Sequence, residues 1–376
     1  MSWLRSINDR RFWGAGVAVA AIAALVLALT GGGADKPSTA SAATGTSSSA
    51  TAAAAAVPYN GPEKKLPHTL AAPKIKKGFK YKLGYMSIYA AIPSLAAVNK
   101  GARDETKRLG GTFILKDGQL NPDKQASQIN ELISQHVDAI AVYPVNPAAL
   151  LPGIKKARKA GIKIVMEDTP PIAGQPLIPG SSTNILQGRD TAEYSIAQGA
   201  AKADPKGKFV SLGLAIPVPL LQYGLKRGIY WAQKFGMKNL GTVNTSQDTA
   251  NGAGAAMTTI LAKYPDVTTV LAYNDQAAGA AASVARASGK TNVKVWGDNG
   301  EPVAIKQIQA GRVFGTYNSD FTSIGRLQAI AVYDLLTKQH LPLPKQVSVG
   351  GQAVTKANAG SVDPLGSKGP LPTLGK

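Results

Sequence analysis

The sequence contains no cysteine, three histidines and few aromatic residues. The absence of cysteine excludes disulfides, thiolate metal sites, a cysteine nucleophile and a lipid-modified N-terminal cysteine. His68, His136 and His340 are far apart in the sequence, so neither a metal centre nor a cofactor is expected. Aromatic residues make up 6% of the 376 residues, but hydrophobic residues make up 44%, which is enough for a sizeable core.

Acidic residues are also scarce: Asp and Glu number 22 against 42 Lys and Arg, which gives a net charge of +20. A charge of this size is typical of proteins that bind nucleic acid or an anionic surface. From Phe79 onward, however, the 33 basic and 19 acidic residues are spread over many segments. The densest cluster, residues 155–159, lies on a predicted helix and is interpreted as a solvated face. No helix-turn-helix or zinc-finger pattern is present, so no nucleic-acid partner is expected.

The N-terminus has the pattern of an export signal. Arg5, Arg10 and Arg11 precede an apolar run from residue 12 to residue 29, and no residue between 14 and 30 is charged. A basic stretch followed by an apolar one is typical of a signal peptide. The length of the run leaves open whether residues 1–30 are a cleaved signal or a membrane anchor. In both cases the rest of the chain is predicted to lie outside the cytoplasm, in the periplasm or at the extracellular face, anchored by residues 12–30 if they are retained.

Residues 31–78 are predicted to be a disordered tether. The segment begins with three glycines, continues through Ala, Ser and Thr, and ends in a stretch rich in Pro and Lys. Such a composition buries little apolar surface.

From residue 80 to residue 349, short apolar runs alternate with longer amphipathic stretches, among them a helix predicted over 184–203. This alternation predicts an α/β fold with two doubly wound parallel-sheet lobes joined by a three-segment hinge. The predicted N-terminal lobe is 79–182 plus 320–349, the C-terminal lobe is 183–319 plus 350–361, and 362–376 is a flexible tail. The chain is expected to cross between the lobes near Ser182, 318–321 and 349–352.

Polar and aromatic residues follow the predicted strands, where ligands bind in sheets of this kind. Amide and carboxylate groups bind hydroxyls, and aromatic rings such as that of Tyr143 cover the apolar faces of sugars. Two alternatives stay open, because Asp168, Asn274 and Asp298 are also common helix N-caps and Tyr143 could be a core residue. No pair of base and nucleophile is recognisable, so the chain is not expected to be an enzyme.

Several motifs between residues 80 and 355 carry a resemblance to a known family. They are Asn121-Pro122, Tyr143-Pro144-Val145-Asn146-Pro147, Tyr264-Pro265-Asp266-Val267, Tyr273-Asn274-Asp275-Gln276-Ala277-Ala278-Gly279-Ala280 and Val354-Thr355-Lys356-Ala357-Asn358. With the order of elements, they resemble the type I periplasmic substrate-binding proteins of sugar ABC transporters, the ribose- and galactose-binding group. The resemblance implies ligand contacts at Ser87, Tyr89, Asp168, Gln222 or Tyr223, Gln247, Asn274, Asp298 or Asn299, and Asn318.

The sequence departs from that family at three places. Thr169 stands where the ribose-type proteins have an arginine, and Gln222 or Tyr223 matches a second arginine. Residues 90–93 replace an aromatic pair. These departures argue against a pocket built on arginine forks and favour a solute that is smaller, less hydroxylated or otherwise different from a pentose or hexose.

Two functions follow from the resemblance. In the first, the chain is an exported monomer that captures a small polar ligand, a sugar or related polyol, and delivers it to the permease of an ABC importer. In the second, the same pocket presents the bound solute to a membrane receptor.

Overall fold

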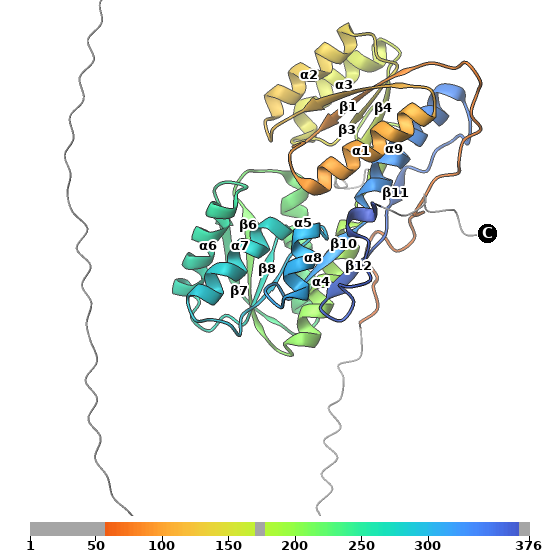
Figure 1. Cartoon of the computed structure of the whole chain (residues 1–376). Helices are drawn as coiled ribbons and strands as arrows, with labels where there is room; N and C mark the ends of the chain where they lie inside the picture. The colour runs from red at the N-terminus through yellow and green to blue at the C-terminus, as the bar shows by residue number, and fades with distance from the viewer. Residues whose placement is uncertain (1–56, 170–176, 368–376) are drawn as a thin grey trace, which may run out of the picture. The chain divides into compact units, whose positions relative to one another are not determined.

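The computed structural model describes residues 57–169 and 177–367. The predicted signal or anchor (1–30) and most of the predicted tether lie outside the described residues. Within those two ranges the chain forms two six-stranded sheets, each covered by helices (Figure 1). The predicted two-lobed α/β fold is confirmed. Across the same ranges, no helix is both long enough and apolar enough to cross a membrane.

The first sheet is parallel throughout and has the strand order β11-β5-β4-β3-β1-β2. Its strands are β1 (Lys82–Ser87), β2 (Thr112–Asp117), β3 (Ala139–Val142), β4 (Lys163–Glu167), β5 (Thr183–Leu186) and β11 (Gln346–Ser348). Its helices are α1 (Pro93–Arg108), α2 (Pro122–Ser134), α3 (Pro147–Lys159) and α9 (Phe321–Thr337).

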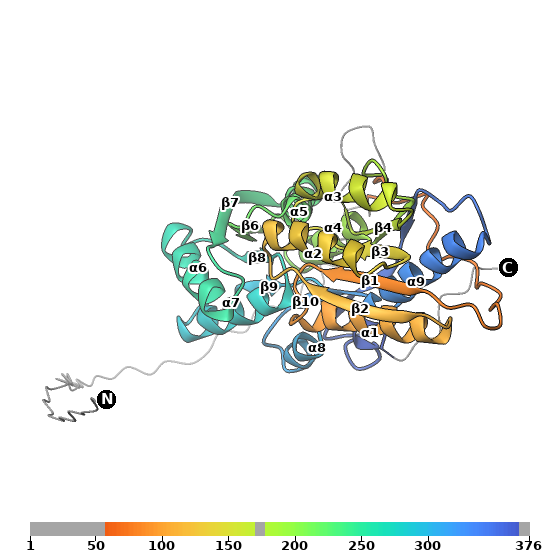
Figure 2. The same cartoon turned by 90° about the horizontal axis from the view of Figure 1, so that it is seen from above.

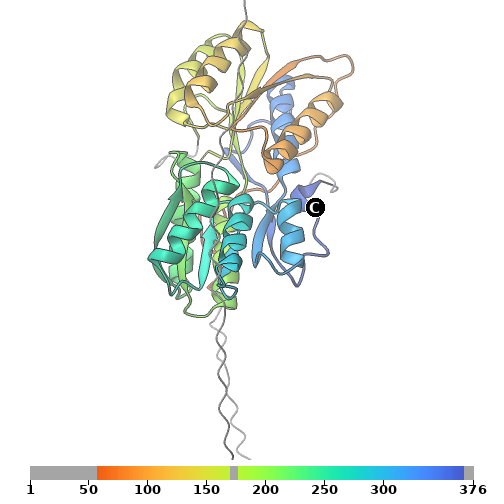
Figure 3. The same ribbon diagram turned by 60° about the vertical axis from the view of Figure 1, so that its left-hand side comes forward.

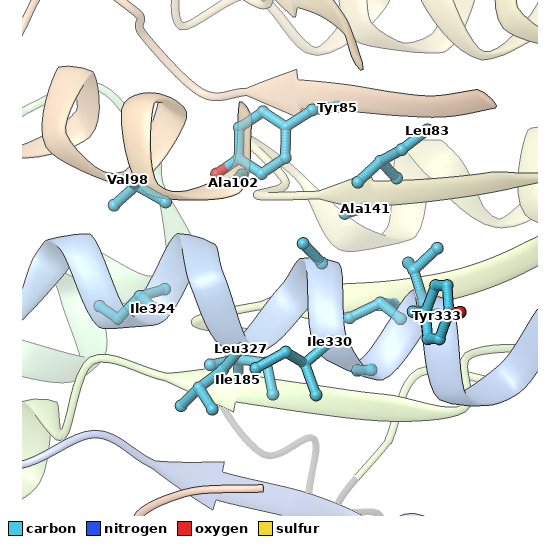
Figure 4. Close-up of a cluster of buried hydrophobic side chains, with 14 of the residues drawn as sticks. Leu83, Tyr85, Val98, Ala102, Ala141, Ile185, Ile324, Leu327, Ile330 and Tyr333 are labelled. Atoms are coloured by element: carbon cyan, nitrogen blue, oxygen red, sulfur yellow. The ribbon is translucent and has the colours of Figure 1, made fainter. Parts of the chain in front are cut away.

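Strand alternation gives the first lobe a core on each face of its sheet. Leu83, Tyr85 and Ala141 point to one face, where they pack on α1 and α9 (Figure 4). Met86 and Ile140 point to the other face and pack on α2 and α3. Helices α1 and α9 lie side by side in Figure 3. Both faces are therefore buried, as the nearly continuous apolar strands require.

The second sheet has the strand order β12-β10-β9-β8-β6-β7, and only β12 is antiparallel to its neighbour. Its strands are β6 (Lys208–Leu214), β7 (Lys238–Thr245), β8 (Thr269–Ala272), β9 (Lys294–Trp296), β10 (Gly315–Ser319) and β12 (Gly351–Thr355). Its helices are α4 (Arg189–Ala203), α5 (Pro219–Lys234), α6 (Ala250–Lys263), α7 (Asp275–Ala287) and α8 (Pro302–Gln309). Helices α6, α7 and α8 share one core and α4 and α5 share the other (Figure 2).

The first crossing between the lobes differs from the prediction. The predicted helix over 184–203 begins five residues late, because Thr183–Leu186 form β5, which pairs with β4 in the first sheet. The first lobe therefore extends to Leu186, and the chain crosses at Gln187 and Gly188 instead of Ser182. Gly188 has a φ of +81°, and a side chain there would meet the carbonyl oxygen of Val349. The other two crossings, β10 to α9 and β11 to β12, fall at 319–320 and 349–350.

Residues 57–78, part of the predicted disordered tether, pack against both lobes, and we call them the N-terminal strap. Tyr59 donates a hydrogen bond to Asp190 of α4 at 3.0 Å and packs on Trp231. The Glu63 carboxylate accepts hydrogen bonds from the backbone N–H groups of Asp190 and Thr191. These N–H groups belong to the first turn of α4, where a helix offers them no acceptor of its own. These contacts join the strap to the second lobe.

The strap then joins the first lobe. Pro67 accepts a backbone hydrogen bond from Ser348 of β11 at 2.9 Å, and Leu70 is buried in the core that α9 shares with the sheet. The backbone N–H of Lys76 donates to the hydroxyl of Tyr333 at 2.7 Å. The prediction of disorder from composition is wrong for this segment, because its few apolar and carboxylate side chains find partners on the folded lobes.

The predicted flexible tail also packs, as far as residue 367. Asn318 donates to the carbonyl of Asp363 at 2.9 Å and accepts from the N–H of Leu365 at 3.0 Å. The carbonyl of Leu365 accepts from Thr322 of α9. These bonds hold a 3₁₀ turn, Pro364–Gly366, against the crossing from β10 to α9. Residues 368–376 of the predicted tail lie outside the described residues.

Candidate ligand-binding site

A small cavity lies between the carboxyl ends of the two sheets, and we call it the inner cavity. Its volume is about 50 Å³. It is lined by residues of both lobes: Ile88, Tyr89, Ile92, Ser94, Leu95, Leu120, Tyr143, Gln187, Arg189, Leu221, Asp248, Tyr273, Asn274, Asn299 and Phe321. The position is the one expected for ligands of open α/β sheets.

Arg189 is the central charged group at this cavity. It is the first residue of α4, and its Nη1 lies 2.8 Å from Oδ2 of Asp298, at the end of β9. Its Nη2 lies 3.6 Å from Oδ2 of Asp168, after β4, and donates to Oε1 of Gln187 at 2.5 Å. The guanidinium thus connects an aspartate of each lobe with a hinge residue.

These charges are buried but not fully paired. The Arg189, Asp298 and Asp168 side chains are 6%, 1% and 3% exposed. Among the described residues, Nε of Arg189 and Oδ1 of Asp298 have no hydrogen-bond partner. A buried polar atom without a partner costs free energy, so these atoms are suited to a polar ligand that enters the cavity.

Burial opposes the ion pairs in setting the pKa values of the two aspartates. It raises the pKa of Asp298 to about 6 and that of Asp168 above its usual range, while Arg189 favours the charged form of both. For Arg189, burial alone lowers the pKa, but Asp298 and Asp168 together hold it above its usual value. The arginine therefore stays charged and keeps the aspartates available as acceptors.

Two of the predicted residues have unusual backbone conformations. Asp168 has a φ of +42° and Asn299 a φ of +118°, both in a region that favours glycine. Such conformations cost of order 1–3 kcal/mol each and cluster at functional sites. Here they follow β4 and β9, and Asn299 lines the cavity while accepting from Gln187 at 3.4 Å.

A second polar group lies on the other side of the cavity. Asn274 caps α7, accepting from the N–H of Ala277 at 2.8 Å, and also donates to Oδ1 of Asp248 at 3.2 Å. Tyr273 donates to the same Asp248 oxygen at 2.6 Å. The cap and the cavity-lining role, which the sequence left as alternatives for Asn274, are therefore both present.

Two tyrosines from the predicted set contribute ring surface. Tyr89 and Tyr143 line the cavity, and the hydroxyl of Tyr143 lies 3.5 Å from Asp168. Tyr143 also packs with Ile88 and Leu220 in an apolar cluster that spans the two lobes. The alternative of a core role for Tyr143 is thus present together with the cavity-lining one.

Seven predicted residues do not line the inner cavity. Asp168 and Asp298 are ion-paired with the lining residue Arg189 but are not themselves part of the lining. Gln222 and Gln247 are exposed. Ser87 is buried, and its carbonyl accepts from Gln125. Asn318 bonds to residues 363 and 365, as described above. Tyr223 lines a separate cavity of about 30 Å³ on the far side of Arg189, which the strap closes with Pro62, Glu63 and Leu66.

Sequence reasoning missed Arg189, Gln187, Asp248 and Phe321. The expectation of a pocket without an arginine fork is wrong, since Arg189 lies at the cavity although no family motif contains it. One signal was available: Gly188 interrupts the predicted helix and is followed by an arginine. A cation at a helix N-terminus is unfavourable unless acidic partners surround it. Asp248 was missed by a single residue, because Gln247 was chosen. Among the described residues, no group of His, Asp or Glu could hold a metal ion.

Two α/β lobes, three hinge crossings and a polar cavity at the strand ends define the architecture of a two-lobed binding protein. Residues 83–340 match the family described as the periplasmic binding protein domain, and the chain belongs to that family.

Curated relatives include proteins named ribose import binding protein. The one from Bacillus subtilis (strain 168) is 27% identical over 245 residues, covering 65% of this chain and 78% of the relative. The one from Escherichia coli (strain K12) is 26% identical over 227 residues, covering 60% and 74%.

Solved structures share the fold. One is an ABC transporter solute-binding protein from Actinobacillus succinogenes 130z with bound D-allose (TM-score 0.69, 20% identity, 75% of this chain and 100% of that chain covered). Another, from Mycobacterium smegmatis, has bound glycerol (TM-score 0.65, 23% identity, 75% and 96% covered).

Proposed function

We propose that this chain is an exported sugar-binding protein that captures a polyhydroxy ligand between its lobes and delivers it to an ABC importer. The observation that carries the proposal is the buried Arg189, which lines the cavity between the lobes and pairs with Asp168 and Asp298 behind it. In this set Nε of Arg189 and Oδ1 of Asp298 have no partner among the described residues. Sugar hydroxyls both donate and accept hydrogen bonds, so they can pair with the guanidinium and with the aspartates at once.

The remaining lining supports the same ligand class. Asn274 and Asn299 add amide groups, and Tyr89, Tyr143 and Phe321 add rings that suit the C–H faces of a sugar. The names of the relatives, ribose import binding protein, and the D-allose and glycerol in the structural neighbours point in the same direction. We infer that Asp168, Asp298, Asn274, Asn299 and Tyr143 contact the ligand.

Delivery to a permease is the part of the proposal that rests on family membership. In a closed binding protein, a ligand that bridges both lobes stabilises the closed state, which a transporter can distinguish from the open one. We propose that the protein acts as a monomer outside the cytoplasm, with the permease as its partner.

The ligand can be identified by thermal-shift screening of pentoses, hexoses, polyols, amino acids and purines, followed by calorimetry. A ligand at 100 times its Kd stabilises the folded protein by about 2.7 kcal/mol. Stabilisation by sugars or polyols and by no other class is expected. Stabilisation by amino acids or purines alone would overturn the proposed ligand class.

Delivery can be tested by adding the sugar-loaded protein to its ABC permease in proteoliposomes and measuring ATP hydrolysis. Stimulation that needs both protein and sugar is expected. Sugar binding without any stimulation would instead favour the receptor alternative.

A further inference from the structure

The inner cavity is small for a whole ligand site in the conformation described. Its volume of about 50 Å³ is well below the roughly 300–1,000 Å³ typical of small-molecule sites. The guanidinium of Arg189 occupies the space between Asp168 and Asp298. It lies 2.8 Å from the carboxylate of Asp298 and 3.6 Å from that of Asp168. A ligand that reaches the unpaired atoms here can place only part of its hydroxyl groups in this cavity.

A much larger cavity adjoins it, and we call it the outer groove. Its volume is about 650 Å³, within the range of roughly 300–1,000 Å³ typical of small-molecule sites. The two cavities share Tyr89, Ile92, Asp248 and Asn274 in their linings. They are therefore neighbouring compartments that a single ligand can span.

Both lobes form the outer groove. The first lobe supplies residues 89–93, before and at the start of α1. The second lobe supplies the faces of α7 and α8, with Gly279, Ala280 and Ala304 as a wall of small residues. The hydroxyl of Ser94 donates to Oε1 of Glu301 at 3.2 Å, and this bond joins the two lobes at the groove.

The polar groups of the groove select against anions. Asp248, Asp275 and Glu301 line it with Gln276 and Gln307, and none of its described lining residues is basic. Burial raises the pKa of Glu301 and, strongly, that of Asp275. A phosphate or carboxylate would face acidic groups without a counter-charge, whereas hydroxyls can donate to them. The small side chains leave a flat apolar wall for a ring face.

We propose that the ligand is a two-ring carbohydrate, a disaccharide or a glycoside, whose first ring lies at the inner cavity and whose second, neutral ring occupies the outer groove. The inference rests on the proposed function and narrows it, since it names the class of sugar. It follows from three observations. The guanidinium of Arg189 occupies the space between the aspartates, the two cavities share lining residues, and the polar lining of the outer groove suits an uncharged ligand.

The test compares free sugars with their two-ring forms by calorimetry: D-glucose with cellobiose and phenyl β-D-glucoside, and D-xylose with xylobiose. At least one two-ring form is expected to bind ten or more times more tightly than its free sugar. The variant Ala280→Leu fills the groove and should reduce this preference at least tenfold. The matched control, Ala255→Leu, makes the same change at an exposed position of α6 and should leave the preference unchanged.

Each outcome has a distinct meaning. Free sugars that bind as tightly as every two-ring form would overturn the inference but leave the proposed function standing. Binding of no carbohydrate at all would overturn both. If the preference for two-ring forms is unchanged in Ala280→Leu, the second ring does not bind in the outer groove and its proposed placement is wrong. If Ala280→Leu does not fold, Ser283→Leu, an exposed groove position on the same helix, replaces it.

Discussion

Two pairs of adjacent residues show how one short stretch of chain serves both the cleft and the interior. In Arg189-Asp190, Arg189 lines the inner cavity, and in Glu167-Asp168, Asp168 is ion-paired with that arginine; we call Asp168 and Arg189 the cleft-facing members. The other member of each pair faces the interior of a lobe. Glu167 accepts hydrogen bonds from Tyr85 and from Gln328 inside the first lobe. Asp190 accepts from donors of the strap and α5: Tyr59, Trp231 and Arg227.

All four groups are buried, so the difference lies in the pairing of Arg189 and of its partner Asp298, since Asp168 itself accepts from the N–H of Gln187. The inward-facing carboxylates are met by protein donors. Around the cleft-facing pair, Nε of Arg189 and Oδ1 of Asp298 have no partner among the described residues. A buried charge whose hydrogen-bond partners all come from the protein stabilises a specific fold. A buried charge that lacks some of its partners is suited to binding a ligand. Changes to the inward-facing members should therefore alter stability, and changes around the cleft-facing ones should alter binding.

The largest effect is expected for Asp190→Ala. This change leaves the buried indole N–H of Trp231 without its acceptor, separates Arg227 from its ion pair and removes the partner of Tyr59. The free energy of unfolding should fall by about 3 kcal/mol, near the lower end for breaking a buried pair, because Arg227 is partly exposed. Urea denaturation measures it. Asp266→Ala, which breaks an exposed pair with Lys208, is the control and should leave stability almost unchanged. Equal effects of the two variants would contradict the structural role of Asp190.

A smaller effect is expected from the titration of Glu167. Burial raises its pKa to about 7, although Tyr85 and Gln328 favour the charged form. Because the folded-state pKa lies above the unfolded one, Glu167 stabilises the fold at low pH, and this contribution is lost as the pH rises toward and through 7. Between pH 5 and pH 8 the loss should be about 2–3 kcal/mol.

Glu167→Gln removes this titration. Urea denaturation of the wild type and the variant at pH 5 and pH 8 isolates it, since all other buried acids are common to both proteins. The stability of the variant should depend less on pH. An identical pH dependence of the two proteins would show that Glu167 is charged throughout this range.

The next effect is on binding rather than stability. Asp298→Asn keeps an acceptor for Arg189 but removes the charge and one unpaired acceptor of the cleft. Affinity for the sugar found by screening should fall by about 10- to 100-fold, the equivalent of roughly 1.5–3 kcal/mol for a hydrogen bond to a charged group. Calorimetry measures it, with Asp266→Asn, far from the cleft-lining set, as the control. An unchanged affinity would remove Asp298 from the site.

Much of the fold followed from periodicity, because each strand of a doubly wound sheet is a short apolar run and each helix an amphipathic one. The missed strand, β5, has only four residues and is separated from α4 by just Gln187 and Gly188. Because the connection between them is so short, the hydrophobic pattern predicted β5 and α4 as one continuous helix. That error also hid Arg189, since a residue inside a predicted helix is not examined as a strand-end residue.

The candidate site was harder to predict than the fold. Asn274 and Asn299, which line the inner cavity, were predicted because they follow strands, and strand ends meet at one edge of a sheet. Gln222, Gln247 and Tyr223 were assigned by position in a family pattern, but the direction of a side chain on a helix or loop depends on tertiary packing. The strap was missed for a related reason: its composition predicts disorder, and partners on α4, α5, β11 and α9 supply the contacts that order it.

The smallest expected effect is that of Tyr59→Phe, and it tests whether the strap belongs to the inward-facing network. The variant removes the hydrogen bond that the hydroxyl donates to Asp190 and the one that it accepts from the backbone N–H of Glu63. It keeps the ring contacts with Tyr194 and Trp231. The free energy of unfolding should fall by about 1 kcal/mol, because Asp190 keeps its other donors. In the background of Asp190→Ala the same change should have a smaller effect, since only the bond from Glu63 is then left to lose. Additive losses in the double variant would show that Tyr59 stabilises the fold independently of Asp190.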